Sequence, residues 1–183
     1  MPGKVGSVPI YVALLRGINV GGSRPVKMQA LRATFARVGC TNVATYIQSG
    51  NVVFAHAEKS EAKLVALVEA AIAKDAKFDV KVVVRTKAEL AKIVAKNPFK
   101  KATDQQLHVF FMAKKPARDA LAKVDAKAFE PEKFAIVDRE LYVYLPNGLG
   151  RSKLAGTLMR KPPIDEATAR NWRTVQTLVA MTG

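Results

Sequence analysis

The feature that most constrains the fold is an uninterrupted apolar stretch near the start of the chain, PIYVALLR at residues 9–16. Its apolar residues follow one another without alternating with polar ones, a pattern typical of a strand buried on both faces. The stretch is too short to span a bilayer. It resembles the core of a signal peptide behind Lys4, but no small-residue cleavage pattern follows it. We therefore expect a central strand of an antiparallel-rich sheet.

The segments that follow alternate between helical and strand patterns. Helical periodicity is found over residues 27–38 and 60–74, and strand patterns are found over residues 42–48, 51–54 and 79–85. The polar turn QSGN joins the second and third strands, and Gly50 supplies the positive φ that a hairpin needs. The resulting order, β-α-β-β-α-β, is that of the ferredoxin-like split unit.

A second α+β unit is expected after Thr86. The spacing of Thr86 and Glu89 matches a capping box, so a helix should begin there and end before Asn97 and Pro98. The later segments predict a strand at 107–112, a helix at 116–123, two strands around a turn at 138–139, a short helix after the loop 145–154, and a last helix from Asp165. The expected fold class is therefore α+β, with two ferredoxin-like subdomains at residues 1–86 and 87–183.

The charge of the chain is strongly basic and unevenly distributed. The net charge is +15, which attracts polyanions, and residues 1–57 and 141–164 contain no Asp or Glu. The single cysteine, Cys40, excludes an internal disulfide and predicts a cytoplasmic location. Because there is one cysteine and the two histidines lie far apart, no metal-ligand spacing is present. We expect no metal and no other cofactor.

The loop GINVGGSRP after the first strand is the first candidate binding element. Gly17 and Gly22 have the spacing of a P-loop, but Ser23, Arg24 and Pro25 follow where that motif needs Lys and Ser or Thr, so a nucleoside triphosphate is not expected. Backbone amides in a glycine loop and at a helix N-terminus favour an anion. The next helix has no acid in its first turn to offset its positive end. The alternative is a strand-to-helix turn whose glycines serve geometry alone.

A second loop, LPNGLGRSKL at residues 145–154, has the same character and leads into another acid-free helix start. We expect both loops to lie on the same side of the molecule and to form one basic, anion-binding concavity. The candidate anion-binding residues are Arg16, Gly17, Asn19, Gly21, Gly22, Arg24, Lys27, Gly148, Gly150, Arg151, Ser152 and Lys153, with Ser49, Asn51 and Asn171 as supporting residues.

No catalytic constellation is visible in the sequence. Ser49 has no evident base beside it, and the acid-free N-terminal segment supplies no carboxylate for general-base catalysis. On the last helix, Trp172 is expected in the core, and Asn171 at the edge of the apolar face must find a hydrogen-bond partner.

Five segments together resemble the family called domain of unknown function 1697. They are ALLRGINVGG, VATYIQSGNVVF, NPF, LPNGLGRSKL and TARNWRTV, which span nearly the whole chain. The resemblance implies a bacterial-type soluble protein of two α+β subunits of ferredoxin-like character, and it brings no activity, cofactor or catalytic residue. One departure is Arg24-Pro25, where many relatives look polar and proline-free.

Three functions are compatible with these observations. The leading hypothesis is a binding protein for an anionic ligand, with nucleic acid the natural polyanion for so basic a chain, although no aromatic-basic RNA-binding motif is present. The first alternative is an enzyme acting on a small phosphorylated or carboxylated substrate, with Tyr46, His108 or Lys27 for proton transfer. The second is an interaction module for an acidic protein. A membrane partner is not expected, and no oligomeric state is predicted.

Overall fold

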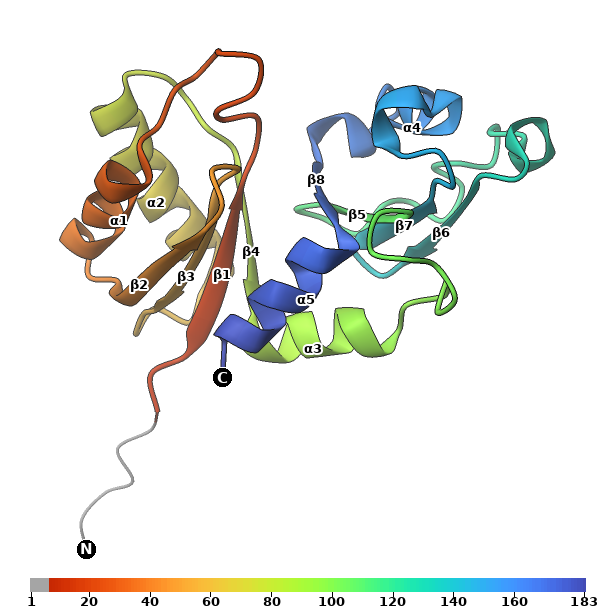
Figure 1. Ribbon diagram of the computed structural model, residues 1–183. Helices are drawn as coiled ribbons and strands as arrows, with labels where there is room; N and C mark the ends of the chain where they lie inside the picture. The colour runs from red at the N-terminus through yellow and green to blue at the C-terminus, as the bar shows by residue number, and fades with distance from the viewer. Residues whose placement is uncertain (1–6) are drawn as a thin grey trace, which may run out of the picture. The chain divides into compact units, whose positions relative to one another are not determined.

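The computed structural model describes residues 7–183, which form two compact units (Figure 1). The first unit contains the described residues up to Glu89 together with Met181–Gly183, and the second is Leu90–Ala180. Along the chain the units divide between Glu89 and Leu90, and the last three residues belong to the first unit; the subdomain bounds 1–86 and 87–183 stay predictions. Each unit has a four-stranded antiparallel sheet with helices, so the predicted α+β class is confirmed.

The first unit has the predicted order of elements. These are β1 (Ile10–Leu15), α1 (Met28–Arg37), β2 (Thr41–Tyr46), β3 (Asn51–Ala55), α2 (Glu61–Ala76) and β4 (Val82–Thr86). The sheet order is β2-β3-β1-β4, and β1 is antiparallel to both of its neighbours. The apolar stretch is therefore an interior strand, as predicted. Helices α1 and α2 lie on the same face of this sheet (Figure 1).

The core of the first unit explains why β1 is apolar without interruption. Tyr11, Ala13 and Leu15 point into the core between the sheet and the two helices, where they join Phe35 of α1. Val12 and Leu14 alternate with them along the strand and are also fully buried. Since both sets of side chains are removed from water, no position of the strand favours a polar residue.

The second unit is built on the sheet order β6-β7-β5-β8, again antiparallel throughout. The elements that lie wholly within it are β5 (Leu107–Phe111), β6 (Lys133–Val137), β7 (Glu140–Tyr144), α4 (Lys153–Leu158) and β8 (Thr168–Asn171), with short 3-10 turns at Ala126–Phe129, Leu149–Arg151 and Ile164–Glu166. Most of α3 (Lys87–Ala95) and of α5 (Trp172–Met181) also belongs to it. The predicted capping box opens α3, because the Glu89 carboxylate accepts from the Thr86 backbone N–H (2.8 Å) and the Glu89 N–H donates to the Thr86 hydroxyl (3.2 Å).

The helix predicted at residues 116–123 is wrong. The segment forms successive turns instead, with backbone bonds from Ala120 to Ala117 and from Ala122 to Asp119. Apart from Pro116 and Leu121, its side chains are exposed or half-buried. A short helix is stable mainly through the apolar face that it packs, and this segment offers almost none.

The start of the last helix is also corrected. Asp165 lies within a 3-10 turn, Ile164–Glu166, which is followed by β8; this strand pairs with β5, so that α5 begins only at Trp172. The helical apolar pattern likewise starts at Trp172, which is 6% exposed and lies in the core as predicted. Asn171 is not on a helix face: it precedes α5, and its Oδ1 accepts from the Thr174 backbone N–H at 2.9 Å.

We expect Asn171→Ala to lower the free energy of unfolding by about 1 kcal/mol, because α5 would lose the cap on its first turn. Asn171→Asp keeps an acceptor at the same place and should leave stability nearly unchanged. Urea denaturation followed by circular dichroism checks both variants. Equal losses in the two would show that the cap contributes nothing.

Candidate anion-binding sites

The loop between β1 and α1 is held in place by Asn19. Its Nδ2 donates to the backbone carbonyls of Val26 (2.9 Å) and Gln48 (2.7 Å), and its Oδ1 accepts from the Val26 N–H (2.8 Å). Asn19 has a φ of 55°, a left-handed conformation that Asn tolerates better than most residues. The side chain predicted to contact an anion thus fixes the loop and joins it to the β2–β3 turn.

The tip of this loop is a two-residue turn at Gly21 and Gly22. The Ser23 N–H and hydroxyl both donate to the Val20 carbonyl, at 3.0 and 2.8 Å. Both glycines have positive φ, 56° and 76°, as the commonest hairpin turns require. These two glycines therefore have a geometric reason to be present.

A basic cavity lies at the base of the same loop. Its volume is about 430 Å³, and it is lined by Arg16, Gly17, Arg24, Asp79 and Lys81. The Arg16 N–H donates to the Lys81 carbonyl at 2.9 Å, which brings the end of β1 beside the residues that precede β4. We call this cavity the basic cavity. It brings together three of the predicted site residues: Arg16, Gly17 and Arg24.

Three cations and one carboxylate face the basic cavity, all with exposed side chains. The Arg24 guanidinium carbon lies 5.8 Å from the centre of the Phe78 ring, so a cation–π contact helps to orient it. The Lys81 ammonium lies 3.8 Å from a carboxylate oxygen of Glu69, a loose ion pair that offsets part of its charge. The cavity thus carries an excess of positive charge.

Asp79 and Lys81 were missed by the sequence analysis. The signal was available, because the predicted β-α-β-β-α-β order places the last strand beside the first. In the structure Leu15 pairs with Val82, so residues just before β4 lie next to residues just after β1. The basic cavity therefore contains an acid, although the windows of the sequence around the loop contain none.

Ser49 and Asn51 stabilise the turn between β2 and β3. Asn51 is fully buried, and its Nδ2 donates to the Tyr46 carbonyl and to the Ser49 hydroxyl, both at 3.0 Å. Neither residue lines the basic cavity. Their connection to the first loop runs through the Gln48 carbonyl, which accepts from Asn19.

Lys27 lies directly before α1 and is exposed. It makes no side-chain cap to the helix, and the first turn of α1 contains no acid, as the sequence indicates. Lys27 does not line the basic cavity and instead lines a smaller cavity between α1 and α2.

At the second loop, the positive end of the following helix is compensated, contrary to the expectation from the sequence. The Ser152 hydroxyl caps α4 by accepting from the Ala155 backbone N–H (2.8 Å). The backbone N–H of Leu154, in the same first turn, donates to the Glu132 carboxylate at 3.1 Å. An acid distant in sequence therefore offsets the positive end of this helix, and the expectation of an unbalanced helix start is wrong here.

A polar cavity of about 440 Å³ lies beside the second loop. Gly148 and Arg151 line it, together with Thr103, Gln105, Gln106, Pro146 and Asn147. Gly150, Ser152 and Lys153 are not among its lining residues. The first loop belongs to the first unit and this loop to the second, so a concavity built by both stays a prediction.

The residues considered for proton transfer, Tyr46, His108 and Lys27, do not line either polar cavity. His108 is 9% exposed, its Nδ1 has no hydrogen-bond partner, and burial lowers its pKa. Among residues 7–183, no three His, Cys, Asp or Glu side chains are grouped as metal ligands would be. No helix in the described part of the chain is both long and apolar enough to cross a membrane.

Cys40 is 4% exposed, and burial raises the pKa of its thiol to about 11. We expect the native protein to react with a thiol reagent at pH 8 at least about a hundredfold more slowly than the urea-unfolded chain, because the thiolate fraction and access both fall. Absorbance on reaction with a disulfide reagent measures this. Equal rates would mean that Cys40 is accessible in the folded state.

A sequence model of the family described as "Protein of unknown function (DUF1697)" matches residues 8–142. The chain belongs to this family. The matched residues include the first loop and the whole basic cavity, and they end before the second loop. The description of the DUF1697 family assigns no activity to its members.

No curated protein matches the sequence. Among solved structures, that of a conserved bacterial protein from Streptococcus pneumoniae is similar, with a TM-score of 0.79 and 22% sequence identity. The similarity covers 97% of this chain and 100% of that one. At 22% sequence identity, this structural similarity supports the fold of the present protein and says nothing about its ligand.

Proposed function

We propose that this DUF1697 protein binds an anionic ligand that carries phosphate, and that the basic cavity holds the phosphate. The observation that supports the proposal is the gathering of Arg16, Arg24 and Lys81 around one cavity of about 430 Å³. Asp79 and the loose ion pair of Lys81 with Glu69 offset part of the repulsion among these cations, and an anion bound between them offsets the rest. The volume lies within the range of small-molecule sites, roughly 300–1,000 Å³.

Phosphate suits this set of side chains better than a monoanion does. A guanidinium donates two parallel hydrogen bonds to phosphate oxygens, and a lysine adds a compact charge. The loop that carries Arg24 is already held by Asn19 and by the Val20–Ser23 turn. Binding therefore orders little additional backbone, which lowers its entropic cost.

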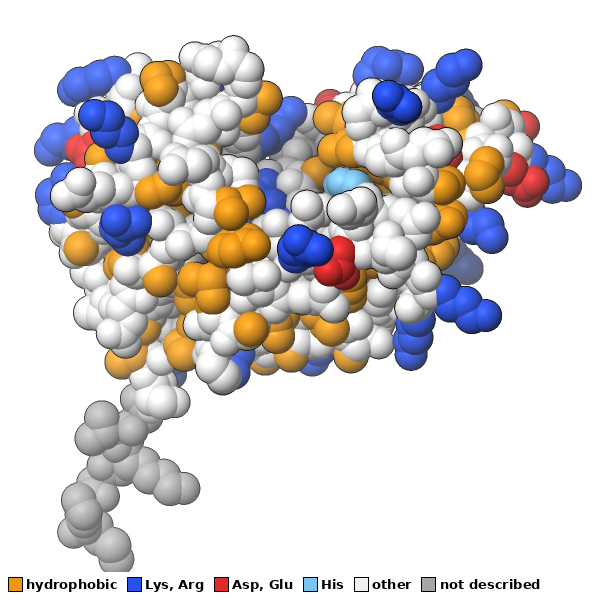
Figure 2. All heavy atoms as spheres, in the orientation of Figure 1, with side chains coloured by type: hydrophobic (Ala, Val, Ile, Leu, Met, Phe, Trp, Pro, Cys, Tyr) orange, Lys and Arg blue, Asp and Glu red, His pale blue; other side chains and the backbone are white. Residues whose placement is uncertain are grey.

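Asp79 gives the cavity an acceptor beside the cations. A hydroxyl or amino group next to the phosphate could donate to it, as in nucleotides and sugar phosphates. Lys and Arg side chains are also spread widely over the visible face of the molecule, with few Asp or Glu among them (Figure 2). That field raises association rates with any polyanion, so nucleic acid stays a candidate source of the phosphate. The lone thiol of Cys40 supports a cytoplasmic location, where both kinds of ligand occur.

The test compares two variants with the same loss of charge. One replaces Arg16, Arg24 and Lys81 by Gln, and the control replaces Lys59, Lys63 and Lys74, which are exposed on or beside α2. Calorimetry with pyrophosphate and anisotropy with a labelled single-stranded oligonucleotide measure binding over a range of salt. Three phosphate contacts give a slope of log K against log salt of about −2 for a single strand.

We expect the cavity variant to lose pyrophosphate binding and to flatten the oligonucleotide slope, while the control binds pyrophosphate like the wild type. Pyrophosphate binding without oligonucleotide binding identifies a small phosphorylated ligand. If both variants lose affinity equally, or if neither probe binds the wild type, the proposal is wrong.

A further inference from the structure

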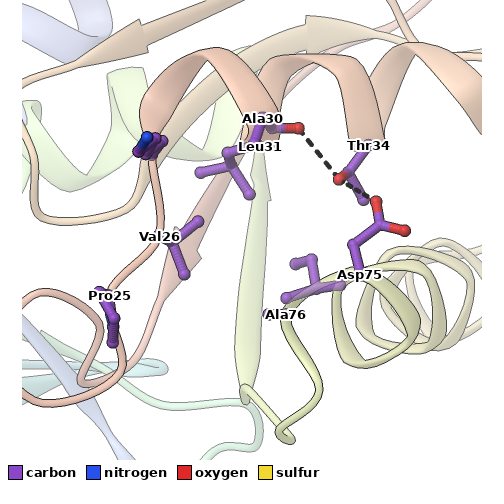
Figure 3. Close-up of a pocket in the computed structure, with 9 residues that line it drawn as sticks. Pro25, Val26, Ala30, Leu31, Thr34, Asp75 and Ala76 are labelled. Atoms are coloured by element: carbon purple, nitrogen blue, oxygen red, sulfur yellow. Dashed lines mark hydrogen bonds between the residues drawn. The ribbon is translucent and has the colours of Figure 1, made fainter.

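A second cavity of the first unit lies between α1 and α2 and has a different chemistry. Its volume is about 140 Å³, and Val26, Leu31, Ile72 and Ala76 form apolar walls. Pro25 and Val26 lie at one end, and Thr34 and Asp75 lie at the other (Figure 3). We call it the interhelical cavity.

The interhelical cavity has the size and lining of a site for a small apolar group. Leu31 and Ile72 are 2% and 1% exposed, so the walls belong to the ordered core. A closed, wholly apolar protein cavity of about 150 Å³ binds benzene, whereas this cavity is open to solvent and is also lined by Lys27, Thr34 and Asp75. The similar volume sets an apolar body of about six carbon atoms as the largest that it accommodates.

The carboxylate at the Asp75 end of the cavity is already paired within the protein. The Thr34 hydroxyl donates to the Asp75 carboxylate (Figure 3), and the Arg37 guanidinium donates to the same oxygen at 2.7 Å. These two bonds lower the pKa of Asp75, so its carboxylate stays ionised at neutral pH. Because the Arg37 cation is paired with this carboxylate, the Asp75 end of the cavity carries little net charge.

The cation among the residues that line the cavity is Lys27, which follows Val26 along the chain. Within the described part of the chain, Lys27 forms no ion pair with a carboxylate. Lys27 thus favours an amphipathic anion that places its charged group toward this side chain and its apolar body toward Leu31 and Ile72.

We infer that the interhelical cavity binds a small carboxylate with an apolar body of about six carbons. Its carboxylate pairs with the Lys27 ammonium, and its hydrocarbon fills the space between α1 and α2. This site is separate from the basic cavity: Arg24 lines the one, and Pro25, Val26 and Lys27, which follow it in sequence, line the other. The inference does not depend on phosphate binding.

The test is calorimetric titration of the full chain with butanoate, hexanoate, octanoate and hexanamide. Affinity should rise about fourfold per methylene up to hexanoate, which is the expected effect of burying one such group, and then level off. Hexanamide, which lacks the charge, should bind at least about fivefold more weakly than hexanoate.

Two variants and one control locate the site. Lys27→Gln should reduce hexanoate affinity to that of hexanamide, and Ala30→Phe, which fills the cavity from an exposed position of α1, should abolish binding. Lys63→Gln, with the same loss of charge on α2, should bind hexanoate like the wild type. Affinity independent of chain length in the wild type, or unchanged binding by Lys27→Gln, would overturn the inference.

Discussion

Replacing Gly50 with alanine is expected to lower the free energy of unfolding by about 3 kcal/mol. Gly50 has a φ of 79°, where an L-residue costs about 1–2 kcal/mol. A Cβ at this position would lie 2.6 Å from the Leu15 Cβ and 3.1 Å from the Ile18 Cδ1. Both neighbours are buried, at 0% and 1% exposure, so relieving the contact requires movement of the core and adds about 1–3 kcal/mol.

The matched control is Gly21→Ala. Gly21 also has a positive φ, 56°, but no atom lies within 4 Å of the Cβ that would be added. Its substitution should cost only the backbone strain, about 1 kcal/mol. Urea denaturation of the two variants separates the cost of the backbone strain from the cost of the contact with Leu15 and Ile18. If both variants lose the same stability, the contact with Leu15 has no energetic role.

The elements that the sequence predicted well are those whose local pattern and buried environment agree. The apolar run at residues 9–16 became β1 because that strand is buried on both faces. By contrast, no pattern in the neighbouring sequence indicates β8. Its four residues, Thr168–Asn171, become a strand through pairing with β5, a contact between segments far apart in sequence. Local reasoning extended the helix of α5 backward over them.

The residues of the candidate site likewise fall into those that a local sequence pattern reveals and those that only the fold brings to the site. Arg16 and Arg24 were found because they flank a glycine loop, a local feature, whereas Asp79 and Lys81 reach the same cavity through the pairing of β1 with β4. Glu132 likewise reaches the amide end of α4 from another part of the second unit. A search for acids along the chain alone misses these charges, because strand pairing and the fold of the second unit bring them near.

Replacing Asn19 with alanine should have an effect as large as that of Gly50→Ala, about 3 kcal/mol. The substitution removes three hydrogen bonds, to Val26 twice and to Gln48, each worth about 0.5–1.5 kcal/mol. It also places alanine at a φ of 55°. Asn42→Ala is the control, since Asn42 has a φ of 50° and is exposed on β2, and its loss should be about 1 kcal/mol.

The Asn19 variant also connects loop order to binding. The Asn19 N–H donates to the Arg24 carbonyl at 3.1 Å, so the side-chain bonds of Asn19 and this backbone bond together position Arg24 at the basic cavity. On the proposed function, Asn19→Ala should weaken pyrophosphate binding by about tenfold although every cation is retained, because the loop must then be ordered on binding. Calorimetry measures the affinity under conditions where the variant is folded. Unchanged affinity would mean that the cavity does not depend on a preformed loop.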